Sequence, residues 1–130
     1  MKIISSKELV TQALKVIKTI TASELKSIFK KDRAALLIDI RDIRELKKSG
    51  KIKIARHMPR GMLEFWLDPE SPYYKKDITP DRTKILYCAS NWRSALATKS
   101  IQEMGFDNVC HVKDGFQAIV DAGFEVEQVE

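Results

Sequence analysis

The sequence predicts a small α/β domain, with a largely parallel sheet that is covered by helices on both faces. Two short and mainly apolar runs, residues 34–39 and 84–88, are typical of strands buried on both sides. Segments with helical spacing of apolar residues alternate with these runs. Strands that alternate with helices along one short chain favour parallel pairing. The chain has 130 residues, which fits one compact domain and leaves no room for a second.

The N-terminal segment is expected to be helical over about residues 6–18. Ser5 and Glu8 form a capping-box signature at its start. Apolar residues then recur at helical spacing, at Leu9, Val10, Ala13, Leu14 and Ile17. We therefore expect residues 1–19 to form a helical extension and residues 20–130 to form the main domain.

Two further helices are expected in the first half of the chain. The capping-box signature of residues 21–24 opens a helix that extends through Phe29. A short helix over residues 42–49 follows the first apolar run and stops at Gly50. Its inward-facing residues are expected to be Ile43 and Leu46.

The long connection of the chain lies between residues 59 and 80, where all four prolines fall. Just before it, residues 51–54 alternate as in a short strand. Within it, residues 61–67 predict a helical turn. The aromatic pair Phe65 and Trp66 on this turn either packs in the core or covers an opening in the domain.

The C-terminal part predicts two more helices and one strand. Residues 93–104 form a helical pattern that stops at Gly105, and residues 108–112 indicate a strand. Asp114 is then expected to cap a last helix, which stops at Gly123. The apolar faces of the two helices are expected to hold Ala97, Ile101, Met104, Phe116, Ile119 and Val120.

The composition disfavours two classes of partner. The N-terminus lacks the apolar region of a secretory signal, and no apolar run is long enough to span a membrane. A soluble cytoplasmic protein with no membrane partner is therefore expected. The net charge is +5, but the basic residues are spread along helical patterns and are not clustered with aromatic residues. No nucleic-acid partner is expected for such a distribution.

The two cysteines, Cys88 and Cys110, are too few for a disulfide framework and lack the paired spacing of a structural zinc site. This favours a reducing compartment, in which at least one thiol is free. Cys110 lies between apolar neighbours and is interpreted as a core residue. His57 and His111 are isolated from each other and have no third ligand at suitable spacing, so no metal site is expected.

Chemistry is expected at Cys88, because open parallel sheets bind ligands where their strands end. Four residues suited to a tight turn follow it: Ala89, Ser90, Asn91 and Trp92. Such a turn directs backbone N–H groups inward, and the positive end of the next helix reinforces them, so a thiolate is stabilised at their centre. Arg93 is disfavoured by the dipole at this helix start, which suggests that it serves an anion. Trp92 is either a rim residue that holds substrate or a packing residue.

Several motifs, taken in this order, resemble the rhodanese family. They are Asp39-Ile40-Arg41, Gly50 with Ile52, Tyr87 to Ser94, Met104 to Val109, and Gly115-Phe116. The likeness covers about residues 20–126. It extends to residues 59–66, which look like an insert of a single-domain prokaryotic subgroup.

The resemblance implies a small rhodanese-like parallel-sheet domain with thiosulfate sulfurtransferase activity. Cys88 would attack the outer sulfur of an anionic donor such as thiosulfate, form a persulfide, and pass the sulfur to a thiophilic acceptor or a sulfur-accepting protein. Arg93 and the amides of residues 89–92 would bind the anion. Asp39 and Arg41 would be structural and would order the loops around the site. No metal or organic cofactor is implied.

The sequence departs from the family pattern at two places. Asn91 stands where rhodanese loops usually have Gly, although Asn tolerates the left-handed conformation better than most residues. Lys53 and Ile54 replace the Pro-Gly that usually follows the Gly-x-Ile element. Neither change removes a reacting group.

The sequence also bears on three other functions. A Ser/His/Asp hydrolase is disfavoured, because the sequence has no Gly-x-Ser-x-Gly turn. A cysteine-dependent phosphatase uses the same thiolate-in-a-loop design, but its loop has five residues between Cys and Arg, whereas four lie between Cys88 and Arg93. A non-catalytic rhodanese-like module that carries sulfur or binds a protein stays open as the alternative, because a fold does not guarantee activity.

Overall fold

The computed structural model describes residues 1–130 and confirms an α/β fold around a parallel sheet. Five strands pair in parallel in the order β1-β6-β5-β2-β4. These strands are β1 (Thr19–Ile20), β2 (Leu36–Asp39), β4 (Arg56–His57), β5 (Lys84–Tyr87) and β6 (Val109–Val112). The remaining two strands, β3 (Lys51–Ile52) and β7 (Val126–Glu127), form a separate antiparallel pair.

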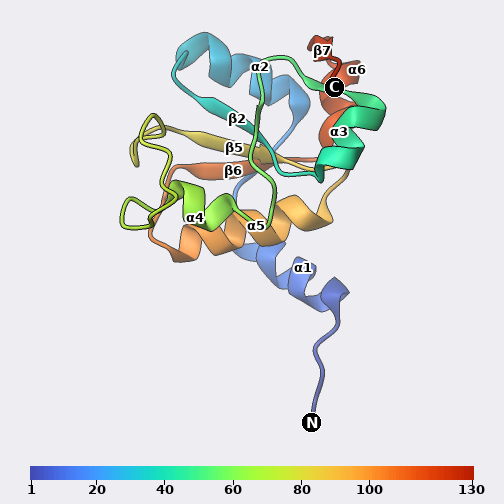
Figure 1. Ribbon diagram of the computed structural model, residues 1–130. Helices are drawn as coiled ribbons and strands as arrows, with labels where there is room; N and C mark the ends of the chain where they lie inside the picture. Colours follow the sequence, from blue (N-terminus) through green and yellow to red (C-terminus); the bar gives the residue numbers. More distant parts are fainter.

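Helices cover both faces of the sheet (Figure 1). They are α1 (Ser6–Val16), α2 (Ala22–Lys31), α3 (Ile43–Ser49), α4 (Leu63–Leu67), α5 (Trp92–Glu103) and α6 (Gly115–Asp121). In Figure 1, α2, α3 and α6 lie above the sheet, α4 and α5 lie below it, and α1 lies outside α5. None of the six has both the length and the apolar character needed to cross a bilayer.

Each face of the sheet has its own core. Successive residues of a strand point to opposite faces, so neighbours in sequence enter different cores. Ile38 and Leu86 belong to the core under α4 and α5, whereas Leu37 and Ile85 belong to the core under α2 and α6. The prediction that these two runs are strands buried on both faces is confirmed, since every residue of β2 and β5 is buried.

The helix starts follow the caps that the sequence predicts. The Ser5 hydroxyl accepts a hydrogen bond from the Glu8 amide at 3.0 Å, and α1 begins directly after it. Thr21 and Glu24 form the complete reciprocal capping box of α2. Such caps satisfy N–H groups that have no partner within the helix, which fixes where each helix begins.

Four apolar residues of the helical patterns are exposed: Leu9, Leu14, Ile43 and Met104. The expectation that Ile43 faces inward and that Met104 lies on an apolar face is therefore wrong. α1 packs on α5 through a narrow strip that contains Val10 and Ala13, so the positions that flank this strip stay in solvent. Ile43 begins α3 and is exposed, whereas the inward position predicted for Leu46 is confirmed. Met104 comes directly after the last turn of α5.

Three local expectations also need correction. The alternation at residues 51–54 gives a strand of only two residues, because the chain turns after Ile52 and leaves Ile54 exposed. Trp66 packs against the core under α4, whereas Phe65 is exposed and covers no opening. Asp114 precedes α6 but makes no side-chain cap, because its backbone is left-handed at φ 63° and its carboxylate is engaged elsewhere.

Candidate functional site

The sheet brings the ends of β2 and β5 together at its carboxyl edge. Asp39 pairs with Tyr87 in the parallel register, and the Ile40 amide donates to the Tyr87 carbonyl at 3.1 Å. Cys88 follows Tyr87 and leads directly into the loop before α5. Ligands bind at this edge of parallel sheets, so Cys88 occupies the position that the fold favours for a site.

The Cys88 thiol lies at the boundary between the core and the polar start of α5. The residue is 1% exposed, and it packs in the core under α5. Its Sγ accepts a hydrogen bond from the Ser94 amide at 3.4 Å and lies 3.4 Å from the Ser94 hydroxyl. Ser94 is in the first turn of α5, so the sulfur sits at the positive end of that helix.

The amides of the loop remain available for an anion. None of the N–H groups from Ala89 to Arg93 donates to another group of the protein, and none of them reaches the Cys88 sulfur within hydrogen-bond distance. The sequence predicts that these amides converge on the sulfur itself. In the structure they are unpaired donors beside it, and the amide of Ser94 makes the contact to the thiol.

The turn between β6 and α6 clamps the loop from its other side. Asn91 Nδ2 donates to the Asp114 carboxylate at 3.0 Å, and the Asp114 amide donates to Asn91 Oδ1 at 2.8 Å. The Phe116 amide donates to the Cys88 carbonyl at 2.9 Å. Gly115 has φ +60°, and a Cβ on it would lie 2.3 Å from the Cys88 carbonyl oxygen. Only glycine fits where the two turns approach so closely.

The departure at Asn91 therefore has a structural explanation that the sequence did not provide. Its backbone has φ −133°, so the loop does not use the left-handed conformation that the family glycine suggested. The left-handed conformation occurs instead at Asp114, in the turn between β6 and α6. The Asn91 side chain ties the two turns together, which is a role that glycine cannot perform.

Arg93 does not point at the thiol. Its Nη1 and Nη2 donate to the two carboxylate oxygens of Glu45 at 2.6 and 3.0 Å. This pairing lowers the pKa of Glu45, because the guanidinium stabilises the charged carboxylate. Glu45 is not among the site residues predicted from the sequence. A signal was present, since Glu45 completes the capping box of α3 with Asp42, but it did not reveal the contact with Arg93.

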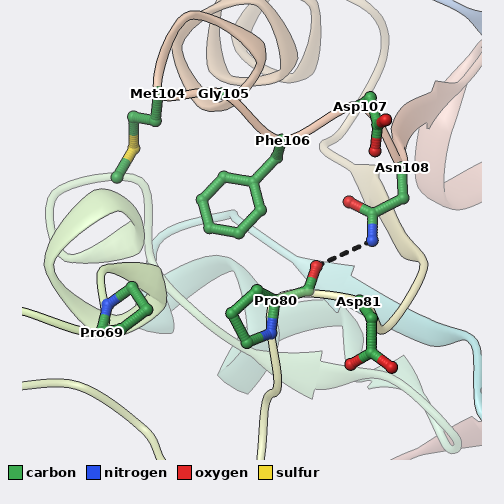
Figure 2. A pocket seen from close by; sticks show the side chains of 8 residues that line it. All are labelled: Pro69, Pro80, Asp81, Met104, Gly105, Phe106, Asp107 and Asn108. Atoms are coloured by element: carbon green, nitrogen blue, oxygen red, sulfur yellow. Dashed lines mark hydrogen bonds between the residues drawn. The ribbon is translucent and has the colours of Figure 1, made fainter.

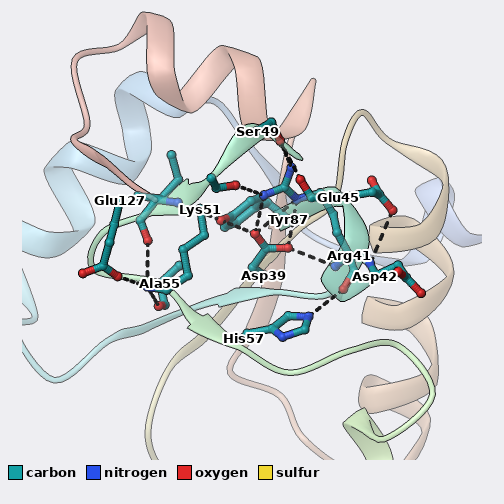
Figure 3. Close-up of polar contacts among 12 residues, drawn as sticks. Asp39, Arg41, Asp42, Glu45, Ser49, Lys51, Ala55, His57, Tyr87 and Glu127 are labelled. Atoms are coloured by element: carbon teal, nitrogen blue, oxygen red, sulfur yellow. Dashed lines mark hydrogen bonds and ion pairs between the residues drawn. The ribbon is translucent and has the colours of Figure 1, made fainter. Parts of the chain in front are cut away.

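Asp39 and Arg41 form a buried ion pair that holds the neighbouring turns in place (Figure 3). Arg41 Nη2 lies 2.8 Å from the Asp39 carboxylate, and both side chains are almost fully buried. The same guanidinium donates to the Gly50 carbonyl at 2.7 Å and to the Ser49 hydroxyl at 3.1 Å. Its carbon lies 4.1 Å from the centre of the Phe116 ring. The pair thus links the end of β2 to α3 and α6.

Tyr87 completes this network one residue before Cys88. Its hydroxyl donates to the Asp39 carboxylate at 2.6 Å and accepts from the Ile52 amide at 3.3 Å. Burial, together with the negative charge of Asp39, raises the pKa of Tyr87. The phenol therefore stays protonated and keeps the Asp39 carboxylate satisfied.

The remaining candidates separate clearly in the structure. Trp92 is 66% exposed, which places it on the surface beside the loop and excludes the packing alternative. Cys110 is buried, and burial raises the pKa of its thiol to about 11. His57 bonds to the Arg41 carbonyl, while His111 is fully buried against Ser94. No three potential metal ligands cluster anywhere in the protein.

The surface hollows of the protein lie away from the Cys88 loop. The first is at the amino end of the strands, where Pro80 precedes β5 and Phe106 precedes β6 (Figure 2). There the side-chain nitrogen Nδ2 of Asn108 donates a hydrogen bond to the Pro80 carbonyl at 2.8 Å. A second hollow beside it is lined by Ile28 and Cys110. Neither hollow includes the Cys88 loop, where the thiol is covered and Arg93 is bound to Glu45.

Comparisons with known proteins agree with this geometry. The profile of the family described as "Rhodanese-like domain" matches residues 21–122, which is most of the chain. No curated protein matches the chain. Among solved structures, a protein of unknown function from Rhodopseudomonas palustris, described as a "Possible Tyrosine Phosphatase", is 39% identical. It covers 98% of this chain and 97% of its own, with a TM-score of 0.88.

Two sulfurtransferases are also similar. The polysulfide-sulfur transferase homodimer of Wolinella succinogenes is 27% identical over 95% of this chain and 88% of its own, with a TM-score of 0.74. A thiosulfate sulfurtransferase from Pseudomonas aeruginosa shares the fold at 22% identity, with a TM-score of 0.72. This second likeness covers 92% of the present chain but 22% of the other.

Proposed function

Because the chain belongs to the rhodanese-like domain family, we propose that it is a sulfurtransferase that carries sulfane sulfur on Cys88. The donor is a small anionic sulfur compound such as thiosulfate, and the acceptor is a thiophilic anion or a sulfur-accepting protein. The observation that carries the proposal is a free thiol at the start of α5, beside the unpaired amides of residues 89–93. Such amides favour negative charge on a transferred sulfur.

The proposed reaction has two displacements on sulfur. The Cys88 thiolate attacks the outer sulfur of thiosulfate, a bond forms between the two sulfurs, and the bond to the sulfite group breaks. Sulfite leaves with the electron pair, and the terminal sulfur of the persulfide keeps the negative charge. The acceptor then attacks that terminal sulfur, and the Cys88 thiolate is released. This is covalent, ping-pong catalysis, and it requires neither a metal nor an organic cofactor.

The chain supplies binding and positioning for these steps. The amides of Ala89, Ser90, Asn91 and Trp92 bind the donor and then the persulfide. Arg93 binds the donor as well, after exchanging its Glu45 partner for the incoming anion. Because Cys88 is 1% exposed, the loop must move slightly to admit the donor. Asp39 and Arg41 hold the turns around the loop and do not touch the reacting sulfur.

The proposal is tested by mass and by turnover. The intact protein incubated with thiosulfate is expected to gain the mass of one sulfur atom, and this gain is expected to disappear on addition of cyanide. Thiocyanate is expected to form in repeated turnovers. Cys88→Ser is expected to abolish both results, whereas the matched variant Cys110→Ser keeps them, because Cys110 is buried on the other face of the sheet. An unchanged mass and no thiocyanate from the wild type would refute the sulfurtransferase.

Assays on the same protein also distinguish a phosphatase and a non-catalytic module from the proposed sulfurtransferase. A phosphatase is favoured by the description of the Rhodopseudomonas palustris protein. It predicts hydrolysis of p-nitrophenyl phosphate that depends on Cys88. A stable gain of one sulfur without thiocyanate formation would instead indicate a sulfur carrier, and a lack of all three results would leave a protein-binding module.

The cell compartment that we propose follows from the reduced state of the thiols. Both cysteines are free, and a persulfide carrier works in a reducing compartment, so we place the protein in the cytoplasm. The similarity to the polysulfide-sulfur transferase makes polysulfide a second donor to test beside thiosulfate. We propose neither a nucleic acid nor a membrane as a partner.

A further inference from the structure

His111 is a buried histidine that the proposed sulfur transfer does not use. It is 0% exposed and lies in β6, next to the strand that leads to Cys88. Both of its ring nitrogens have partners. Nδ1 lies 2.8 Å from the Ser94 hydroxyl, and Nε2 lies 2.9 Å from the Thr19 hydroxyl. A buried imidazole with two hydroxyl partners, one of which contacts the candidate nucleophile, calls for an explanation beyond packing.

The contacts form a continuous chain from the sulfur to the surface. Cys88 Sγ lies 3.4 Å from Ser94 Oγ, which bonds to His111 Nδ1, and His111 Nε2 bonds to Thr19 Oγ1. Cys88, Ser94 and His111 are buried, whereas Thr19 lies in the edge strand β1 and is exposed. The chain therefore connects a covered thiol with solvent at the edge strand β1.

The direction of the hydrogen bonds follows from the charge on the sulfur. Burial lowers the pKa of His111, so the ring is neutral at pH 7 and carries one proton. A sulfur anion can only accept, so the Ser94 hydroxyl donates to it and not to the Asn91 carbonyl, which lies 3.4 Å from Ser94 Oγ and keeps the Ala95 amide as its donor. Ser94 Oγ then accepts from the Nδ1–H of His111, and the bare Nε2 accepts from the Thr19 hydroxyl. All members are satisfied in this arrangement, and it suits an anion at Cys88.

We propose that His111 is a positioning residue that, with Ser94 and Thr19, forms a relay that stabilises the anionic sulfur of Cys88 and conducts the thiol proton to solvent. This inference rests on the proposed function of Cys88. When the thiol ionises, its proton passes to Ser94 Oγ, the Ser94 proton passes to His111 Nδ1, the Nε2 proton passes to Thr19 Oγ1, and the Thr19 proton passes to water. One proton leaves the protein, and the imidazole changes from its Nε2–H to its Nδ1–H tautomer.

No other ionisable side chain bonds to the members of the relay. Arg93 is the nearest charged side chain in sequence to Ser94, and Glu45 neutralises it. The anionic sulfur of Cys88 is thus stabilised locally by the hydroxyls of Ser94 and Thr19, the neutral ring of His111 and the Ser94 amide.

The relay is tested by the pH profile of Cys88 alkylation with iodoacetamide, measured in Cys110→Ser protein so that one thiol reacts. His111→Leu removes both hydrogen bonds of the ring. It is expected to move the profile to higher pH and to lower the alkylation rate at pH 7 about ten-fold, the size of one lost hydrogen bond to a charged group. His111→Asn keeps an amide N–H in the place of Nδ1–H, and it is expected to restore most of the rate.

A packing role predicts the opposite order, because asparagine leaves a larger cavity than leucine. Thr19→Val is expected to shift the profile in the same direction as His111→Leu, by a smaller amount. Thr98→Val makes the same substitution at a threonine outside the relay: Thr98 is buried, its hydroxyl has no partner, and the change is expected to leave the profile unaltered.

An alkylation profile of His111→Leu that equals that of wild type, or a His111→Asn profile as displaced as that of His111→Leu, would overturn the relay. Alkylation reports on the thiol alone, whereas thiocyanate formation reports on sulfur transfer. A wild type that transfers no sulfur but shows the predicted order of alkylation profiles would refute the proposed function and leave the relay intact.

Discussion

The close approach of Gly115 to the Cys88 loop gives a sharp prediction for the variant Gly115→Ala. The added Cβ would lie 2.3 Å from the Cys88 carbonyl oxygen and 2.8 Å from the Ser90 carbonyl oxygen. Ordinary contacts begin at 3.4 Å, so the loop has to move by about 1 Å. Both obstacles are backbone atoms, which cannot rotate away as a flexible side chain can.

A displacement of this size acts directly on the proposed chemistry, because the loop carries the donors for the anion. A misplacement of about 1 Å costs on the order of 100-fold in turnover. The left-handed backbone at Gly115 adds a stability cost of about 1–2 kcal/mol for alanine. We therefore expect Gly115→Ala to fold with reduced stability and to lose about 100-fold in thiocyanate formation, measured by steady-state kinetics beside urea unfolding.

The chain offers a matched control in Gly105→Ala. Gly105 also has a positive φ, at +108°, but a Cβ there would meet nothing within 4 Å. This variant is expected to lose stability through backbone strain and to keep its turnover. If Gly115→Ala retained a turnover within a few-fold of that of Gly105→Ala, the loop would not depend on this contact and the reasoning would fail.

Three further predictions concern ionisable groups, of which two lie around the site and one, Cys110, lies in the core on the other face of the sheet. Asp39→Asn leaves the Arg41 guanidinium buried without its counter-charge and is expected to lower the free energy of unfolding by about 3 kcal/mol in urea titrations. Asp42 and Arg44 are also two residues apart but form an exposed pair, so Asp42→Asn, which can still cap α3, is expected to change the free energy of unfolding little. Equal losses in the two variants would contradict the argument. Glu45→Gln releases Arg93 toward the donor and is expected to raise kcat/KM for thiosulfate about two- to five-fold, and a decrease would disprove this. The pKa of Cys110 is raised to about 11 from an ordinary 9, so its contribution to stability is full below pH 9 and is lost toward pH 11. Between pH 8 and pH 10, wild type should lose about 1 kcal/mol more than Cys110→Val does, and parallel losses would rule out this thiol as the cause.

The sequence predicted the backbone of this domain well, because short-range signals determine it. The apolar runs at β2 and β5 and the capping box at Thr21 depend only on neighbouring residues. The predictions failed where distant packing decides the outcome. Leu9 and Leu14 have helical spacing, but α1 packs on α5 through Val10 and Ala13, so a narrow strip is buried instead of a broad face.

The site was predicted only in part, for the same reason. Cys88 at a strand end and the loop after it follow from local patterns. The partners of that loop come from distant segments: Glu45 binds Arg93, Asp114 binds Asn91, and His111 lies against Ser94. A single sequence contains no signal that pairs residues so far apart, so these contacts appear only when the sheet assembles them.

The arrangement of charge at Cys88 follows from these pairings. Each guanidinium near the thiol has a carboxylate partner, since Arg41 is paired with Asp39 and Arg93 with Glu45. The two charges of each pair largely cancel at a distance, so we expect the start of α5, whose Ser94 amide donates to the sulfur at 3.4 Å, to contribute most of the local positive potential. Such dipoles act at short range and are fixed by the fold, so they stabilise a single charged sulfur atom without reorganisation. A site of this kind selects among anions by the position of their negative charge more than by their total charge. That property suits a persulfide, whose charge stays on one terminal atom.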